Sequence, residues 1–142
     1  MTDKLTVVLD VNIIVSGFLR GGGTPLEIVR HWEAERVRVV LSEHIIATVL
    51  AVWDRPLFAM RADRIHRALA VELMYEQAVL VVPDPSVEGI TDDQEDDAVL
   101  GTAVAAGADY LVTGDQGLLA IGSHAGVTIV TARQFLEILD TE

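Results

Sequence analysis

The sequence predicts an α/β protein, a three-layer α/β/α sandwich around a mainly parallel central sheet, and two observations lead to this prediction. Short apolar runs alternate along the chain with longer stretches of helical spacing, and such alternation favours parallel strands covered by helices on both faces. Hydrophobic residues make up 51% of the chain and aromatic residues only 5%. A core dominated by alanine, valine and leucine suits helices packed on a sheet better than a β-sandwich.

Five short apolar runs predict the strands. They are rich in β-branched residues, and their lengths are typical of buried strands. The runs are residues 5–9, 37–41, 78–82, 110–113 and 127–130.

The helices between these runs carry their own start signals. Thr24 and Glu27 have capping-box spacing with Pro25 at the first helical position, and Thr131 and Gln134 repeat the spacing before a last helix that ends near residue 139. Further helices are expected at 43–53 after Ser42, at about 62–77, from the capping-box pair Asp92 and Glu95 to residue 106, and, as a short helix, after the fourth strand.

The length of the chain indicates one domain, residues 1–142, and its composition limits the kinds of binding site that it could form. The chain has no cysteine, which excludes disulfides and thiolate metal sites and fits a cytoplasmic protein. No signal peptide is visible, and the most apolar stretch, residues 98–112, is shorter than a membrane span, so no membrane contact is expected. Net charge is −12, and seven of the 22 acids lie between Asp84 and Asp97. Acidity alone indicates solubility, whereas this clustering needs its own explanation.

Three carboxylates from separate segments are predicted at one edge of the sheet. Asp10 follows the first strand, Asp115 follows the fourth, and Asp96 lies in the first turn of the helix that ends at residue 106. Sites in parallel sheets form beyond the carboxyl ends of the strands. Close carboxylates repel one another, and hard oxygen ligands without cysteine favour Mg²⁺ or Mn²⁺ over zinc. Each acid taken alone also fits a capping or solvated role.

Three short motifs in order resemble the PIN-domain family. They are residues 9–12 (Leu-Asp-Val-Asn), 96–100 (Asp-Asp-Ala-Val-Leu) and 113–115 (Thr-Gly-Asp), and the resemblance extends from residue 5 to about 135. The chain looks most like bacterial toxins of toxin–antitoxin pairs related to VapC. The resemblance implies an endoribonuclease, a hydrolase that cleaves RNA phosphodiester bonds with water activated by one or two Mg²⁺ or Mn²⁺ ions. It also implies a cognate antitoxin and a homodimer.

The resemblance also assigns roles to site residues by motif. Asp10, Asp96 and Asp115 would be the catalytic metal carboxylates, Asn12 and Thr113 would orient them through hydrogen bonds, and Asp93 falls where relatives often carry an additional acid.

One position departs from the family pattern. Relatives carry a glutamate in the helix after the second strand, about six residues beyond the serine that matches Ser42, and here that residue is Thr48. A threonine can hydrogen-bond a bound water but cannot neutralise a cation. Glu43 is the nearest carboxylate and a candidate substitute, although it lies about 140° around the helix from Thr48. The alternative is a non-catalytic relative that binds RNA or a protein partner.

The basic and imidazole side chains leave several interpretations open. A group of arginines would form a ridge that contacts RNA or a partner, or else a solvated helix face paired with nearby acids. None of the four histidines is spaced as a metal ligand, so each is expected to be structural or on the surface. The arginines are Arg55, Arg61, Arg64 and Arg67.

Two further predictions concern assembly and a competing activity. Ile65, Leu69, Leu73 and Met74, or the helix at 45–53, would form the surface of a homodimer unless these apolar stripes face the core. An aspartate-based phosphoryl-transfer enzyme or receiver ranks last, because position 12 is asparagine rather than aspartate and no lysine follows Lys4 in the sequence.

Overall fold

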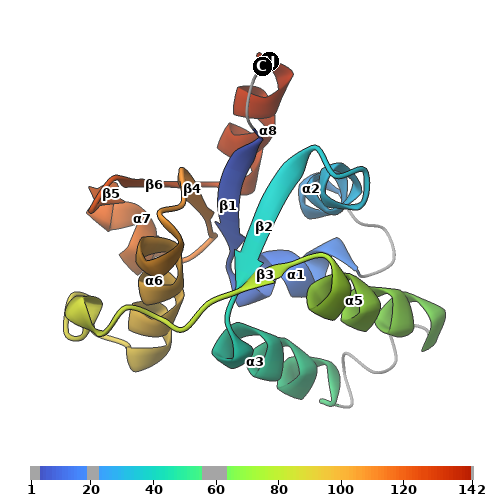
Figure 1. Ribbon diagram of the computed structural model, residues 1–142, viewed down its shortest axis with the longest axis horizontal. Helices are drawn as coiled ribbons and strands as arrows, with labels where there is room; N and C mark the ends of the chain where they lie inside the picture. Colours follow the sequence, from blue (N-terminus) through green and yellow to red (C-terminus); the bar gives the residue numbers. More distant parts are fainter. Residues whose placement is uncertain (1–3, 19–22, 56–63, 142) are drawn as a thin grey trace.

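The fold was analysed in a computed structural model that describes residues 4–18, 23–55 and 64–141. Its strands form one sheet in the order β3-β2-β1-β4-β6-β5 (Figure 1). The neighbours from β3 to β6 pair in parallel, and β5 pairs antiparallel with β6. The strands are β1 (Leu5–Leu9), β2 (Val37–Leu41), β3 (Val79–Leu80), β4 (Tyr110–Val112), β5 (Ser123–His124) and β6 (Val127–Val130).

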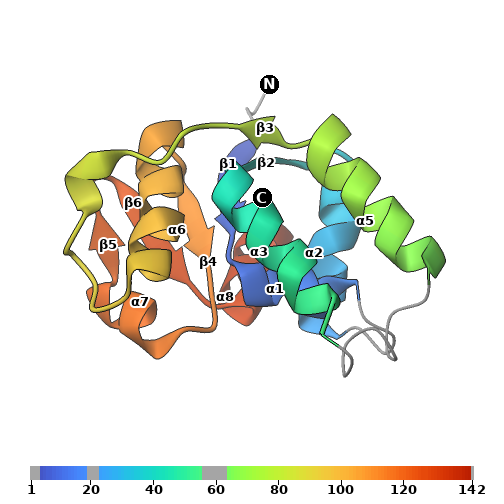
Figure 2. The same ribbon diagram turned by 90° about the horizontal axis from the view of Figure 1, so that it is seen from below.

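Helices cover both faces of this sheet, which confirms the predicted α/β/α arrangement (Figures 1 and 2). Helix α6 packs over β1, β2 and β4 and contacts α3, while α2 packs on β2, α8 packs on β4, and these two helices contact each other. The helices are α1 (Val11–Gly17), α2 (Thr24–Glu33), α3 (Glu43–Trp53), α5 (Arg64–Glu76), α6 (Gln94–Ala106), α7 (Gln116–Ile121) and α8 (Ala132–Asp140), with a 3₁₀ turn η1 (Pro85–Val87).

The central strand β1 shows why the sheet is buried on both sides. Its consecutive residues Val7, Val8 and Leu9 are all fully buried, although their side chains point alternately to opposite faces. An antiparallel sheet with one solvated face would alternate apolar and polar residues instead. Hydrophobic side chains therefore fill both layers, and the polar groups of the protein concentrate at the strand ends.

Three expectations about local structure were wrong, and two elements were missed. The run at 78–82 was expected to be a buried strand, but β3 is an edge strand in which Val79 is 47% exposed, because among the described strands it pairs with β2 alone. Thr24 does not cap α2, whose N-cap is Gly23. Helix α6 is capped by Asp93 rather than Asp92. Helix α1 and strand β5 were not predicted at all.

Other helix predictions hold. The capping box of Thr131 and Gln134 is present at the start of α8, and α3 begins after Ser42 as expected. The helix expected at 62–77 is described from Arg64 to Glu76, and its expected first residues lie outside the described part of the chain. Among the described helices, none is long and apolar enough to cross a membrane.

Candidate active site

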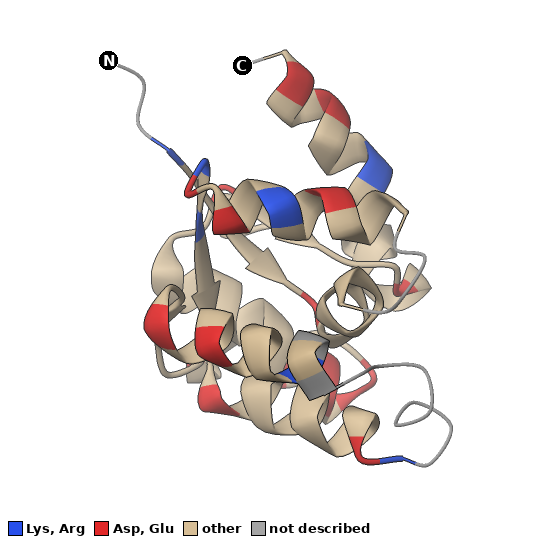
Figure 3. Ribbon diagram, turned by 90° about the vertical axis from the view of Figure 1, so that its right-hand side faces the viewer, with Lys and Arg blue, Asp and Glu red and all other residues tan. Residues whose placement is uncertain are grey.

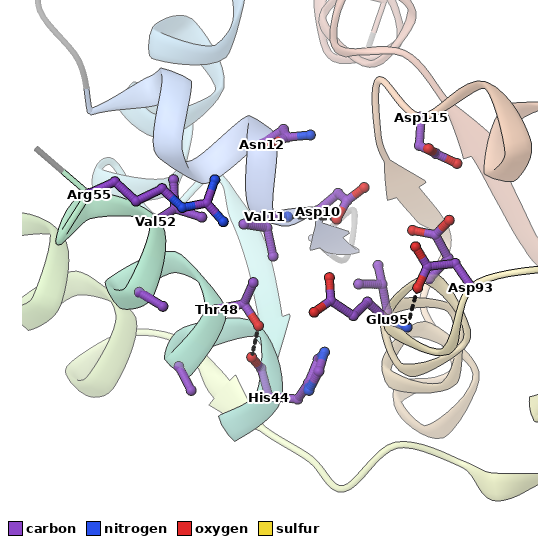
Figure 4. A pocket seen from close by; sticks show the side chains of 14 residues that line it. Asp10, Val11, Asn12, His44, Thr48, Val52, Arg55, Asp93, Glu95 and Asp115 are labelled. Atoms are coloured by element: carbon purple, nitrogen blue, oxygen red, sulfur yellow. Dashed lines mark hydrogen bonds between the residues drawn. The ribbon is translucent and has the colours of Figure 1, made fainter. Parts of the chain in front are cut away.

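A cavity of about 540 Å³ opens at the carboxyl ends of β1 and β4. Asp10 directly follows β1 and Asp115 is the third residue after β4, so the strand ends deliver both carboxylates to one edge of the sheet. Helix α3 forms one wall and the first turns of α6 form the other (Figure 4). The lining residues are Asp10, Val11, Asn12, His44, Ala47, Thr48, Ala51, Val52, Arg55, Asp93, Glu95, Asp96, Val99 and Asp115.

Three of the cavity acids also cap helices. One carboxylate oxygen of Asp10 accepts from Val11 N at 2.7 Å at the start of α1, and Asp115 accepts from Leu118 N at 2.9 Å at the start of α7. Asp93 accepts from Glu95 N at 2.8 Å at the start of α6. The capping interpretation is therefore confirmed for these three acids, and it does not exclude a role in a site, because each cap engages one oxygen and the side chain still borders the cavity.

Thr113 holds two of these acids in place. It is fully buried, and its hydroxyl donates to Asp10 Oδ2 at 2.6 Å while its oxygen accepts from Asp115 N at 3.0 Å. The expected orienting hydrogen bond to Asp10 is therefore present. Asn12, the other residue expected to orient the acids, lines the cavity but forms no side-chain hydrogen bond with another described residue.

The acids shift one another's protonation. Burial raises the pKa of Asp10, although the hydrogen bonds from Thr113 and Val11 oppose this effect. The pKa of Asp96 is raised to about 6, first by burial and then by the charges of Asp115, Asp93 and Asp10. Burial is thus the larger cause of both shifts, and the neighbouring negative charges add to it; a bound cation would oppose both effects.

Asp97, next to Asp96, has a different task. Its buried carboxylate accepts from Gly89 N and Thr91 N, both at 2.8 Å, and these bonds lower its pKa. Asp97 thus fastens the loop between η1 and α6 and does not line the cavity. The two adjacent aspartates therefore have different roles. Asp96 lines the cavity, whereas Asp97 holds the loop that precedes α6.

The acids match a hard divalent cation in donor chemistry, since all are carboxylates and Arg55 is the one Lys or Arg among the lining residues. Acidic segments recur on several elements while basic ones are sparse (Figure 3). Among the described residues, however, no three His, Cys, Asp or Glu side chains converge tightly enough to hold an ion together in this conformation. Binding would require at least one carboxylate to rotate inward.

The sequence matches the family model described as "PIN domain" over residues 6–117. The chain belongs to the PIN domain family. The match includes Asp10, Asp96 and Asp115, and it ends shortly after the last of them. No curated protein matches the sequence significantly.

Solved structures share this PIN fold at low sequence identity. VapBC2 from Rickettsia felis, bound to a DNA fragment from its promoter, has a TM-score of 0.59 at 12% identity over 88% of this chain and 97% of that one. The Mycobacterium tuberculosis toxin VapC20, which cleaves the Sarcin-Ricin loop, has a TM-score of 0.58 at 10% identity over 84% and 97%. FitAcB from Neisseria gonorrhoeae has a TM-score of 0.55 at 15% identity over 89% and 98%.

Within this PIN domain, Thr48 and its candidate substitute Glu43 lie in different places relative to the cavity. Thr48 lines the cavity, but its hydroxyl donates to the His44 carbonyl of its own helix at 2.8 Å. Glu43 is exposed and is not among the lining residues. Two polar lining residues, His44 and Glu95, were not predicted as site residues, because nothing local distinguishes a helix residue facing solvent from one facing another helix.

Of the four arginines in the predicted ridge, the structure describes the side chains of Arg55 and Arg67. Arg55 is exposed at the cavity rim, and Arg67 pairs with Asp54 at 2.9 Å, joining α5 to the end of α3. This contact is exposed and contributes little stability. Arg61 lies outside the described residues, as does the side chain of Arg64.

Proposed function

We propose that this PIN domain is a divalent-metal-dependent endoribonuclease and the toxin of a toxin–antitoxin pair. The observation that carries the proposal is the single cavity of a PIN domain that Asp10, Asp96 and Asp115 all line. These acids come from three separate segments, so a solvated charge run does not account for their sharing one cavity. The pKa of Asp96, raised first by burial and then by the neighbouring acids, is consistent with a cation-binding role.

Asp10, Asp96 and Asp115 would hold one or two Mg²⁺ or Mn²⁺ ions, with Asp93 as an additional acid. When bound, the ions supply an activated water and neutralise charge at the phosphate. Thr113 fixes the Asp10 carboxylate through its 2.6 Å hydrogen bond and so limits the directions in which that carboxylate can bind.

RNA is the proposed substrate, and an antitoxin is the proposed protein partner. The similar fold of VapC20 belongs to a toxin that cleaves the Sarcin-Ricin loop, and VapBC2 is bound to DNA from its promoter. Arg55 at the cavity rim is a suitable contact for a phosphate or for a partner's carboxylate. A homodimer is also proposed, and the exposed Ile65 and Leu69 suit such a surface better than Leu73 and Met74, which are buried.

A second candidate function is a non-catalytic PIN relative that binds RNA or a protein. The observation that favours it is Thr48, whose hydroxyl hydrogen bonds within α3 and leaves that wall without a carboxylate. Such a protein would use the same cavity for recognition alone.

Cleavage of labelled, structured RNA separates the two candidates. Wild type, Asp10→Asn and Asp96→Asn are each assayed with Mg²⁺, Mn²⁺ or EDTA. The Asp96 carboxylate accepts no hydrogen bond from a described backbone group, so its substitution leaves no helix cap unmade. We expect metal-dependent cleavage by wild type, a loss of at least about 100-fold in both variants, and full activity of the control Asp92→Asn, which lies outside the cavity. Equal traces of cleavage in wild type and both variants would support the binding protein instead.

A further inference from the structure

The α3 wall of the cavity carries no acid. Its lining residues are His44, Ala47, Thr48, Ala51 and Val52. Thr48 donates its hydroxyl proton to the His44 carbonyl, so it offers the cavity only its uncharged oxygen. A cation held between the two walls would therefore receive all its negative charge from the strand ends and from α6.

Glu95 on the opposite wall is placed to supply charge toward α3. It lies two residues after the N-cap Asp93 in the first turn of α6 and lines the cavity. Figure 4 shows its side chain extending from α6 across the cavity toward Thr48. Successive helix residues diverge by about 100°, so Glu95 and Asp96 face different parts of the cavity from one turn.

The carboxylate of Glu95 is also uncommitted. Asp10, Asp93 and Asp115 each give an oxygen to a helix cap, and Asp10 gives the other to Thr113. Glu95 accepts no hydrogen bond from a described residue and forms no ion pair with one. Its longer side chain can therefore reorient within the cavity without breaking a hydrogen bond or ion pair to a described residue.

We propose that Glu95 is a metal-binding carboxylate of this site and supplies from α6 the charge that α3 lacks at Thr48. The inference rests on the proposed metal-dependent function. It assigns the role to Glu95 in place of Glu43, which is exposed outside the cavity. The competing explanation is that Glu95 only complements the N-terminal dipole of α6.

The test is Mn²⁺ binding, measured by isothermal titration calorimetry on the whole chain with no RNA present. Glu95→Gln is expected to weaken Mn²⁺ affinity by about 10–100-fold, the range typical for losing a group that supports a bound metal. Glu43→Gln removes the same charge outside the cavity and is expected to bind Mn²⁺ like wild type. Adding Thr48→Glu to Glu95→Gln places a carboxylate on the facing wall and should recover affinity.

Thermal melting in EDTA separates metal binding from a role in the helix. Wild type and Glu95→Gln should have the same melting temperature when no metal is present. When Mn²⁺ is added, the melting temperature should rise more in wild type than in Glu95→Gln. Unchanged Mn²⁺ affinity in Glu95→Gln, together with weakened affinity in Asp96→Asn, would overturn the role of Glu95 and leave the proposed function standing. A wild type that neither binds Mn²⁺ nor cleaves RNA would overturn the proposed function itself.

Discussion

At the scale of single residues, the aspartates of this PIN domain each perform two tasks. Asp10 caps α1 with one oxygen and is held by Thr113 through the other, and Asp115 caps α7 while its backbone N–H donates to the same threonine. Burying a carboxylate is costly unless it is hydrogen bonded. The caps thus make it possible to keep acids at a partly buried strand end, where a cation could bind them.

Thr113→Val should show how much the orienting hydroxyl contributes. Valine keeps the shape but removes the donor to Asp10 Oδ2, leaving a buried carboxylate oxygen without that partner. We expect the free energy of unfolding at neutral pH to fall by about 1–3 kcal/mol. Urea denaturation in EDTA measures this, with Thr113→Ser as the matched control because serine keeps the hydroxyl. Equal stability of the two variants would mean that the 2.6 Å bond makes no net contribution.

Single residues also show which parts of the candidate site could be predicted from the sequence. Asp10 and Asp115 could be placed at one edge because each lies just beyond a run that predicts a strand, and the structure brings both to one cavity. Their metal-binding role stays a prediction. Glu95 could not be selected, because a first-turn glutamate has the same local pattern whether it faces solvent or α3. Only the packing of α3 beside α6 distinguishes these cases.

At the scale of elements, the predictions failed where the signal depended on neighbours. The run around Val79 is as apolar as a buried strand, but its position at the sheet edge is decided by topology and leaves Val82 84% exposed. The sequence pattern did not determine which residue caps α6, since Asp92 and Asp93 are both suitable N-cap residues and the structure has Asp93. Helix α1 was missed because it begins directly at the end of β1, with no intervening turn signal.

Gly101 in α6 marks a contact between elements that local propensity would not predict. A Cβ there would lie 2.9 Å from the Asp84 carbonyl oxygen and 3.1 Å from Val87, and Asp84 N donates to the Gly101 carbonyl at 3.0 Å. Alanine is favoured over glycine by about 1 kcal/mol inside a helix. We nevertheless expect Gly101→Ala to lower the melting temperature, because the η1 segment must move away from α6. Ala105→Gly in the same helix is the control for propensity alone, and a higher melting temperature for Gly101→Ala would contradict this packing argument.

At the scale of the whole molecule, the net charge of −12 acts most strongly where acids are closest together. The raised pKa of Asp96 means that the folded protein binds a proton more tightly there than the unfolded chain does. The folded state therefore bears a cost in the absence of metal, and that cost depends on pH. Acid clusters maintained at such a cost are common at functional sites, where binding offsets the repulsion.

The pH dependence of stability should reveal this cost. The pKa of Asp96 is about 6 in the folded protein, against an ordinary value of 3.8. Between these values the folded state holds more protons, so the contribution of Asp96 to stability falls as pH rises and levels off above about 6. In EDTA, Asp96→Asn should thus become progressively more stable than wild type as pH rises through this window, as measured by urea denaturation at a series of pH values.

A divalent cation should reverse that order, and the reversal links the charge of the whole molecule to its site. Mg²⁺ bound to folded wild type stabilises it by mass action, by about 2.7 kcal/mol at 100 times the dissociation constant. If Asp96 is a ligand as proposed, Asp96→Asn should gain less, so wild type should become the more stable protein above pH 6. Asp92→Asn, which removes an exposed charge outside the cavity, controls for the change in net charge. If both variants responded alike to Mg²⁺ and to pH, the repulsion would belong to the acidic surface in general, and the cavity would have no special affinity for a cation.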